Sequence, residues 1–137
     1  MAPEIIENRP YDGIKADIFS LGQLLFNLVN NMFGFISSRS NDHYYSLIRN
    51  NQLNDYWNSG PFHNINPSNE FKNLFIRMVA HNPLQRPTID EILNDPWMQE
   101  INNLNNDEIN ALEHELRNEL HNREAQIDNN LQNEDDE

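Results

Sequence analysis

The sequence contains no cysteine, and this absence excludes three kinds of site at once. Without a thiol the chain cannot form a disulfide framework, a cysteine nucleophile or a cysteine-based zinc site. Histidine does not supply a replacement. His114-Glu115 begins like the helix of a zinc protease, but Asn118 occupies the position of the second ligand. We therefore predict no metal site.

Positive charge is scarce and unevenly placed. Nine Lys and Arg side chains stand against 22 Asp and Glu side chains, which gives a formal net charge of −13. Residues 1–100 hold 11 acids and 7 bases, whereas residues 101–137 hold 11 acids and only two bases, Arg117 and Arg123. Binding to nucleic acid requires Lys and Arg to displace the counterions of phosphate. We therefore expect no nucleic-acid partner.

The chain has no apolar run long enough to cross a membrane. Its longest apolar stretch, residues 18–35, is interrupted by serine, glutamine and asparagine. The start Met1-Ala2-Pro3-Glu4 has an acid and a proline where a signal peptide has positive charge followed by apolar residues. We therefore expect no membrane partner and a location inside the cell, in the cytoplasm or the nucleus.

Hydrophobic periodicity predicts an all-α fold with no convincing strand. From Asp17, which is expected to open the helix, to Val29, apolar residues surround most of the helix circumference. This is the pattern of a helix that is packed on nearly all sides. So short a chain offers few elements to cover such a helix, and part of the partner surface is expected to be missing.

Capping signals locate two further helices. One follows Ser68, its expected N-cap, and has apolar residues at the i, i+3, i+4, i+7 and i+8 positions. Another begins at Thr88, where Thr88-Ile89-Asp90-Glu91 has the form of a capping box, and is expected to stop near Pro96. A weaker helix is expected over residues 42–51, and a loop over residues 58–67.

The acidic segment 101–137 has a thin helical stripe of apolar residues. Its members are Ile109, Leu112, Leu116, Leu120, Ile127 and Leu131. With Arg123 in the gap, the spacing is an 11-residue rhythm that keeps a nearly straight seam on one face. The pattern fits a solvated helix with a disordered end over residues 133–137, and it also fits a helix that binds a partner helix over residues 107–131.

Four short motifs, taken in order, resemble the eukaryotic protein kinase domain of the serine/threonine type. They are Ala2-Pro3-Glu4, Asp17-Ile18-Phe19-Ser20-Leu21-Gly22, Asn82-Pro83-x-x-Arg86-Pro87-Thr88 and Asp95-Pro96-Trp97. The resemblance covers about residues 1–100 and implies the last part of the kinase C-lobe, from the end of the activation segment through helices F to I. It implies two regions: a partial C-lobe at 1–100, and an acidic, Asn- and Glu-rich tail at 101–137 that is helical and partly disordered.

The resemblance also implies roles for five residues. In kinases similar to this chain, Glu4 forms a buried structural ion pair with Arg86, and the Asp17 carboxylate accepts hydrogen bonds from backbone N–H groups of the catalytic loop and so holds that loop in place. Leu24 and Leu28 match positions that support the apolar column beneath adenine, so both are expected to be buried. Each residue also fits a simpler structural role. Glu4 and Arg86 could be unrelated surface charges, and Asp17 could be a charge near a helix N-terminus. Leu24 and Leu28 could be ordinary core residues.

The resemblance implies that the catalytic parts of a kinase are missing here. The sequence has no His-Arg-Asp and no Asp-Phe-Gly, and its four glycines stand too far apart to form a phosphate-binding loop. We therefore predict no catalytic residue, and we expect ATP and Mg²⁺ only for a complete kinase.

Two hypotheses follow from these missing parts. In the first, Met1 is an internal residue of a longer kinase, and the partners are a protein substrate or the missing N-terminal half. In the second, the chain is a stand-alone, non-catalytic interaction module.

We predict that the isolated chain is only marginally stable, because an uncovered face of the helix at residues 18–29 would expose apolar surface. Thermal unfolding of the purified 137-residue chain, followed by circular dichroism, checks this. A cooperative transition well above room temperature would contradict it.

Overall fold

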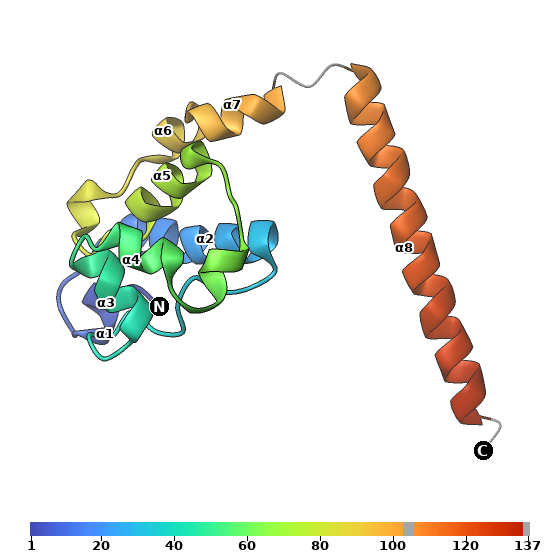
Figure 1. Cartoon of the computed structure of the whole chain (residues 1–137), viewed down its shortest axis with the longest axis horizontal. Helices are drawn as coiled ribbons and strands as arrows, with labels where there is room; N and C mark the ends of the chain where they lie inside the picture. Colours follow the sequence, from blue (N-terminus) through green and yellow to red (C-terminus); the bar gives the residue numbers. More distant parts are fainter. Residues whose placement is uncertain (103–105, 136–137) are drawn as a thin grey trace. The chain divides into compact units, whose positions relative to one another are not determined.

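The structure is a computed structural model that describes residues 1–102 and 106–135, with side chains described over 1–99 and 108–123 (Figure 1). It divides into two compact units, Met1–Gln99 and Glu100–Glu137. The elements in order are α1 (Pro3–Ile6), α2 (Gly13–Asn30), α3 (His43–Arg49), α4 (Leu53–Asn58), the 3₁₀ turn η1 (Gly60–Asn64), α5 (Asn69–Met78), the 3₁₀ turn η2 (Pro83–Gln85), α6 (Ile89–Leu93), α7 (Pro96–Asn102) and α8 (Asn106–Asp135). No strand occurs in the described ranges, and the predicted all-α fold is confirmed.

Helix α2 begins at Gly13, because the Asp12 side chain accepts a hydrogen bond from the backbone N–H of Ile14 at 2.8 Å. It ends where Asn31 adopts the left-handed conformation, with φ of 54°. The expected start at Asp17 is wrong. The apolar pattern becomes continuous only at Asp17, whereas the hydrogen-bonded cap lies a turn earlier.

Local capping places the next helices where the sequence predicts them. The Ser68 side chain accepts a hydrogen bond from Phe71 N at 3.2 Å and starts α5. Thr88 and Glu91 form the complete capping box of α6, with bonds of 3.2 Å and 2.7 Å. The weaker helix expected over residues 42–51 is α3. These predictions are confirmed.

Several short elements were not predicted. They include α1, η1, which lies within the loop expected over residues 58–67, and α4, which lies mostly between that loop and the helix expected over residues 42–51. Pro96, expected to end a helix, starts α7 instead, because proline suits the first position of a helix. Asp95 supports this start by accepting a hydrogen bond from Trp97 N at 2.9 Å.

No helix within the described residues is both long enough and apolar enough to span a bilayer.

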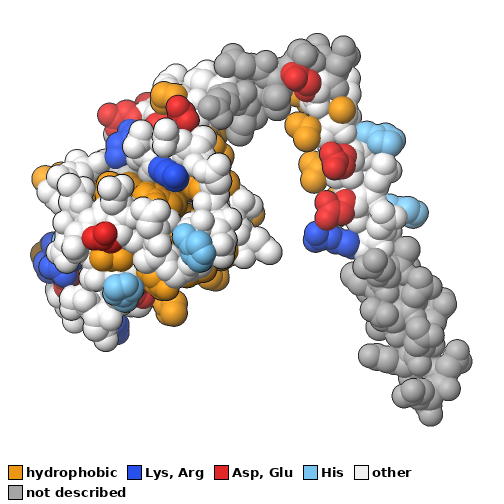
Figure 2. All heavy atoms as spheres, viewed as in Figure 1, with side chains coloured by type: hydrophobic (Ala, Val, Ile, Leu, Met, Phe, Trp, Pro, Cys, Tyr) orange, Lys and Arg blue, Asp and Glu red, His pale blue; other side chains and the backbone are white. Residues whose placement is uncertain are grey.

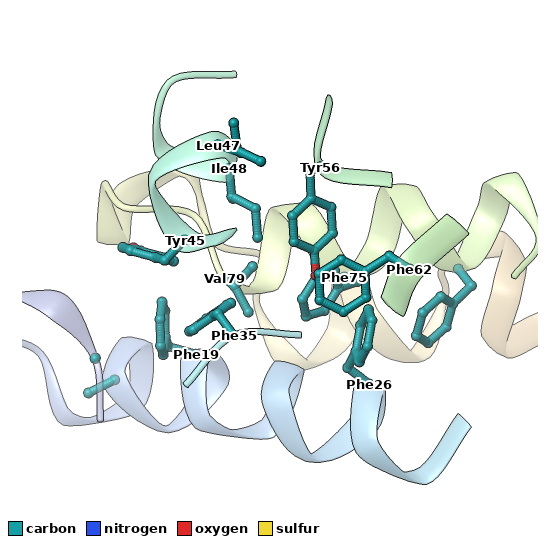
Figure 3. Packing of buried hydrophobic residues seen from close by; sticks show 13 residues of the cluster. Phe19, Phe26, Phe35, Tyr45, Leu47, Ile48, Tyr56, Phe62, Phe75 and Val79 are labelled. Carbon is teal, nitrogen blue, oxygen red and sulfur yellow. The ribbon is translucent and has the colours of Figure 1, made fainter. Parts of the chain in front are cut away.

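Aromatic side chains fill the core between α2, α4 and α5 (Figure 3). The ring of Phe26 on α2 lies 4.6 Å from that of Phe75 on α5, measured between centroids. The ring of Tyr56 lies 4.7 Å from that of Phe62. The Tyr56 hydroxyl donates to the Gly34 carbonyl at 3.0 Å, so its one polar group is satisfied inside the core.

One face of α2 remains exposed. The exposed fractions are 39% for Leu21, 52% for Leu24, 72% for Leu28 and 44% for Val29. The expected burial of Leu24 and Leu28 is therefore wrong for this chain, whereas the exposed face agrees with the expectation that part of the surface covering this helix is missing. The reason is geometric: the packed aromatic residues of the unit lie on the other side of α2 (Figure 3).

Helix α8 forms the second unit and runs from Asn106 to Asp135. The partly disordered end expected over residues 133–137 stays a prediction; the described helix ends at Asp135, and residues 136–137 lie outside the described part. The four stripe residues with described side chains, Ile109, Leu112, Leu116 and Leu120, are 39–60% exposed. The side chains of Ile127 and Leu131 lie outside the described residues.

We predict that Gly22→Ala destabilises the first unit, because α2 and α5 approach too closely to admit a methyl group. A Cβ atom at Gly22 would lie 2.9 Å from both Met78 Cβ and Val79 Cγ1. The expected loss is about 1–3 kcal/mol in the free energy of unfolding, measured by urea denaturation.

Gly13→Ala is the matched control, since a Cβ atom there meets nothing within 4 Å. It should leave stability unchanged or raise it by about 0.5–1 kcal/mol. Equal losses in the two variants would contradict the close approach of α2 and α5.

Candidate functional site

The first turn of the chain places Glu4 in the interior. Pro3 starts α1, where its missing N–H costs no helical hydrogen bond. Ala2 is fully buried, and the Met1 carbonyl accepts a hydrogen bond from Ser38 Oγ at 2.7 Å, which ties this turn to the segment before α3. Glu4 is only 1% exposed. A carboxylate at this depth requires a charged or hydrogen-bonded partner.

Arg86, which follows η2, is that partner. Its Nη1 donates to Glu4 Oε1 at 2.7 Å and its Nη2 to Glu4 Oε2 at 2.8 Å. This is the bidentate geometry that makes Arg–carboxylate pairs strong and directional. Arg86 is 2% exposed, so the whole pair is withdrawn from water. The two residues are 82 positions apart in the sequence.

Arg86 also binds the backbone of two neighbouring segments. Its Nη1 donates to the Lys15 carbonyl at 2.8 Å, and its Nε donates to the Ala80 carbonyl at 2.9 Å. The Lys15 ammonium in turn donates to the Arg86 carbonyl at 2.6 Å. The guanidinium lies 4.9 Å from the centre of the Phe19 ring, within cation–π range. Sequence reasoning missed these partners, because a carbonyl acceptor has no signature in residue type.

Two opposing effects act on the pKa of Glu4. Burial pushes it upward, but hydrogen bonds and positive charge from Arg86 outweigh burial, and the pKa falls below its ordinary value of 4.5. Glu4 is therefore ionised in the folded chain. A lowered folded-state pKa contributes stability that is present above the unfolded pKa and is lost as pH falls through the folded one.

A second candidate surface lies on the exposed face of α2. Asp17, Leu21 and Leu24 line an open groove of about 510 Å³, together with Ile14 and, from α6, Ile89. Asp17 is the one ionisable residue among those that line it. The Asp17 carboxylate is exposed and makes no hydrogen bond or ion pair with any residue in the described part of the chain.

The structure brings the predicted site residues together in two groups. Glu4 and Arg86 form one group, and Asp17 and Leu24 meet in the groove, with Leu28 one turn further along the same helix face. The two groups use different faces of α2. Arg86 packs over the buried Phe19, whereas Asp17 and Leu24 face outward.

Comparison with known proteins identifies the family. Residues 1–98 match the family profile of the protein kinase domain. The chain belongs to the protein kinase family, and the resemblance seen in its motifs is confirmed.

Three relatives illustrate the match. Sperm motility kinase Z of Mus musculus is 33% identical over 98 residues, which are 72% of this chain and 18% of that protein. Serine/threonine-protein kinase kin-29 of Caenorhabditis briggsae is 34% identical over 116 residues, 85% of this chain and 13% of that protein. CBL-interacting protein kinase 31 of Oryza sativa subsp. japonica is 34% identical over 99 residues, 72% of this chain and 20% of that protein. The chain thus spans a fifth or less of the length of these relatives.

The family implies ATP and Mg²⁺ for a complete kinase, but the residues of this chain do not fit either group. The groove on α2 has one carboxylate and no Lys or Arg to hold phosphate oxygens. Among the residues that the structure describes, no cluster of three or more His, Asp or Glu side chains could hold a metal ion. Neither a nucleotide nor its metal is therefore assigned to residues of this chain.

We predict that Glu4→Gln costs about 3–5 kcal/mol of unfolding free energy at neutral pH, because it leaves the charge of Arg86 buried without a partner. Urea unfolding measured across acidic and neutral pH checks this. Below the ordinary Glu pKa of 4.5 the wild-type chain should lose part of its stability, while the Gln variant lacks that loss.

Glu7→Gln is the control. Glu7 holds Arg9 at 2.7 Å at the surface, with 37% of the Glu7 side chain exposed, and its loss should cost less than about 1 kcal/mol. Identical pH profiles for Glu4→Gln and Glu7→Gln would contradict the role assigned to the buried pair.

Proposed function

We propose that this chain is the C-terminal part of the C-lobe of a protein serine/threonine kinase. The complete protein would transfer the γ-phosphate of ATP to a serine or threonine hydroxyl of a protein substrate. The observation that carries this proposal is the buried bidentate pair of Glu4 and Arg86, formed by the two motifs that bracket the lobe. The names of the matched relatives support the same activity.

In this proposal Glu4 and Arg86 are positioning residues. They hold the first turn of the chain against α2 and the end of α5, through the carbonyls of Lys15 and Ala80. In kinases that this chain resembles, that turn ends the activation segment, which presents the protein substrate. The pair would therefore fix the substrate-binding side of the lobe without touching the reacting atoms.

The groove on α2 would receive the missing half of the kinase. The unpartnered carboxylate of Asp17 can accept backbone N–H bonds from a loop laid across it, and such charge-assisted bonds are strong. Leu24 and Leu28 would then be covered and would support the apolar column beneath the adenine ring. Their present exposure of 52% and 72% is consistent with a partner surface that this chain does not contain.

We propose further that this chain does not catalyse by itself. Phosphoryl transfer in kinases requires a lysine and a glycine-rich loop at the phosphates, a catalytic-loop aspartate and asparagine, and a metal-binding aspartate. The corresponding His-Arg-Asp and Asp-Phe-Gly motifs do not occur in the 137 residues. The proposed location is inside the cell, in the cytoplasm or nucleus.

A second candidate function is that of a stand-alone, non-catalytic interaction module. One observation favours it: residues 1–99 form a unit with its own aromatic core, while the groove on α2 stays open for another protein. In that case the kinase family membership is ancestral, and the groove serves binding only.

We predict that the native product is longer than this chain. Immunodetection with an antibody against the tail, followed by peptide mapping upstream of Met1, measures its mass. The expected result is a chain at least about twice as long, whose upstream peptides contain the missing lysine, aspartate and glycine motifs. A single product of 16.2 kDa would overturn this proposal in favour of the interaction module.

A phosphotransfer assay separates activity from size. The purified 137-residue chain should transfer no phosphate from ATP to serine- and threonine-containing peptides, and the longer product should do so. Phosphotransfer by the short chain would contradict its predicted inactivity.

A further inference from the structure

Helix α8 is the largest feature that the kinase proposal leaves unexplained. The kinase profile ends at residue 98, and α8 starts at Asn106 and makes up most of the second unit. It is 30 residues long. In proteins, most of the stability of such a helix comes from packing one of its faces rather than from helix propensity. The exposed apolar side chains in the described part of α8 therefore indicate which face of the helix a partner could cover.

The apolar stripe of α8 is continuous over its first four members, which we call the seam. Ile109, Leu112, Leu116 and Leu120 follow each other at spacings of three and four residues, so they lie on one side of the helix. Their exposed fractions run from 39% at Ile109 to 60% at Leu120. Figure 2 shows the apolar side chains gathered along one edge of the upper part of α8, next to acidic ones.

The charge beside this seam is mainly negative, with Arg117, three residues before Leu120, as a basic residue on its other flank. Glu115 and Glu119 lie next to the stripe along one flank, separated by one helical turn. Arg123 falls where the stripe is interrupted, and Glu119 holds it at 2.8 Å, so its positive charge is locally compensated. The segment from 101 to 137 has 11 acids and 2 bases in all, a net charge of −9.

We propose that α8 binds a basic amphipathic helix of another protein, with the α8 seam packed against an apolar stripe and the α8 glutamates beside Lys or Arg of the partner. A straight seam of one apolar residue per turn matches a second helix lying alongside it. A second copy of α8 would place two strongly acidic segments together, and like charges at such short range repel. An anionic membrane surface is disfavoured for the same reason.

The test uses a synthetic helical peptide as the probe, with leucine at i, i+3, i+4 and i+7 and lysine beside the leucines. It is titrated against the full 137-residue chain by fluorescence anisotropy at low and high salt. The control probe has glutamate in place of lysine. We expect binding of the lysine peptide, weakened by salt, and at least tenfold weaker binding of the glutamate peptide.

Two pairs of variants separate the seam from general acidity. Leu112→Asn with Leu116→Asn should weaken binding at least tenfold, whereas Ala111→Asn with His121→Asn, on other faces of α8, should leave it within twofold. Glu115→Gln with Glu119→Gln should weaken binding and flatten its salt dependence. Asp55→Asn with Glu70→Gln removes the same charge from the first unit and should change neither.

Any of five outcomes would overturn the proposal, four of them in binding or assembly and one in stability. The first four are no binding of the lysine peptide, equal binding of both peptides, equal losses from seam and control variants, and a dimer of the chain that the seam variant abolishes in sedimentation. A lower unfolding temperature of the chain in the seam variant, without any peptide, would show that the seam packs within the chain and would also overturn it. None of these results depends on whether a longer kinase exists.

Discussion

The buried ion pair between Glu4 and Arg86 is the interaction on which the first unit depends. It joins two segments 82 residues apart, and both of its charges are withdrawn from water. A charge in that position is tolerated only because the guanidinium also satisfies the carbonyls of Lys15 and Ala80. Arg86 therefore joins three segments, namely the first turn of the chain, the start of α2 and the residues after α5. The aromatic core packs beside it.

Helix α2 connects this centre to the candidate binding surface. Its buried face carries Phe19 against the guanidinium and Phe26 against Phe75 of α5. Its outer face carries Asp17 and Leu24 in an open groove. A rigid helix packed on one face presents the other face in a fixed geometry. The buried pair therefore helps to fix the orientation of the groove, although it does not line the groove itself.

Helix α8 is stabilised differently from the first unit, Met1–Gln99, which we call the kinase unit. The kinase unit is held by aromatic packing and a buried charge pair, so its stability is internal. Helix α8 has a narrow apolar seam beside strong negative charge, and its ion pair between Arg123 and Glu119 joins residues only one helical turn apart. Such a helix gains stability mainly from a partner that covers the seam and compensates the charge.

Local signals in the sequence were sufficient where a helix end depends on nearby hydrogen bonds. Ser68 and the capping box at Thr88 were predicted correctly, because a cap lies within three residues of its acceptor or donor. The start of α2 and the helix that begins at Pro96 were missed. In both cases an aspartate cap, at Asp12 and Asp95, decided the helix start, whereas the prediction relied on the apolar pattern and on proline as a terminator.

The sequence by itself determined the all-α class, the main capped helices and the membership of the kinase family, since all of these rest on residue types at short or fixed spacing. Only the tertiary structure decided that Arg86 donates to Lys15 and Ala80, because backbone carbonyls carry no residue signature. It also decided that Leu24 and Leu28 are exposed. An apolar residue has the same pattern in the sequence whether its covering partner is present or not, and burial is a property of what surrounds the residue.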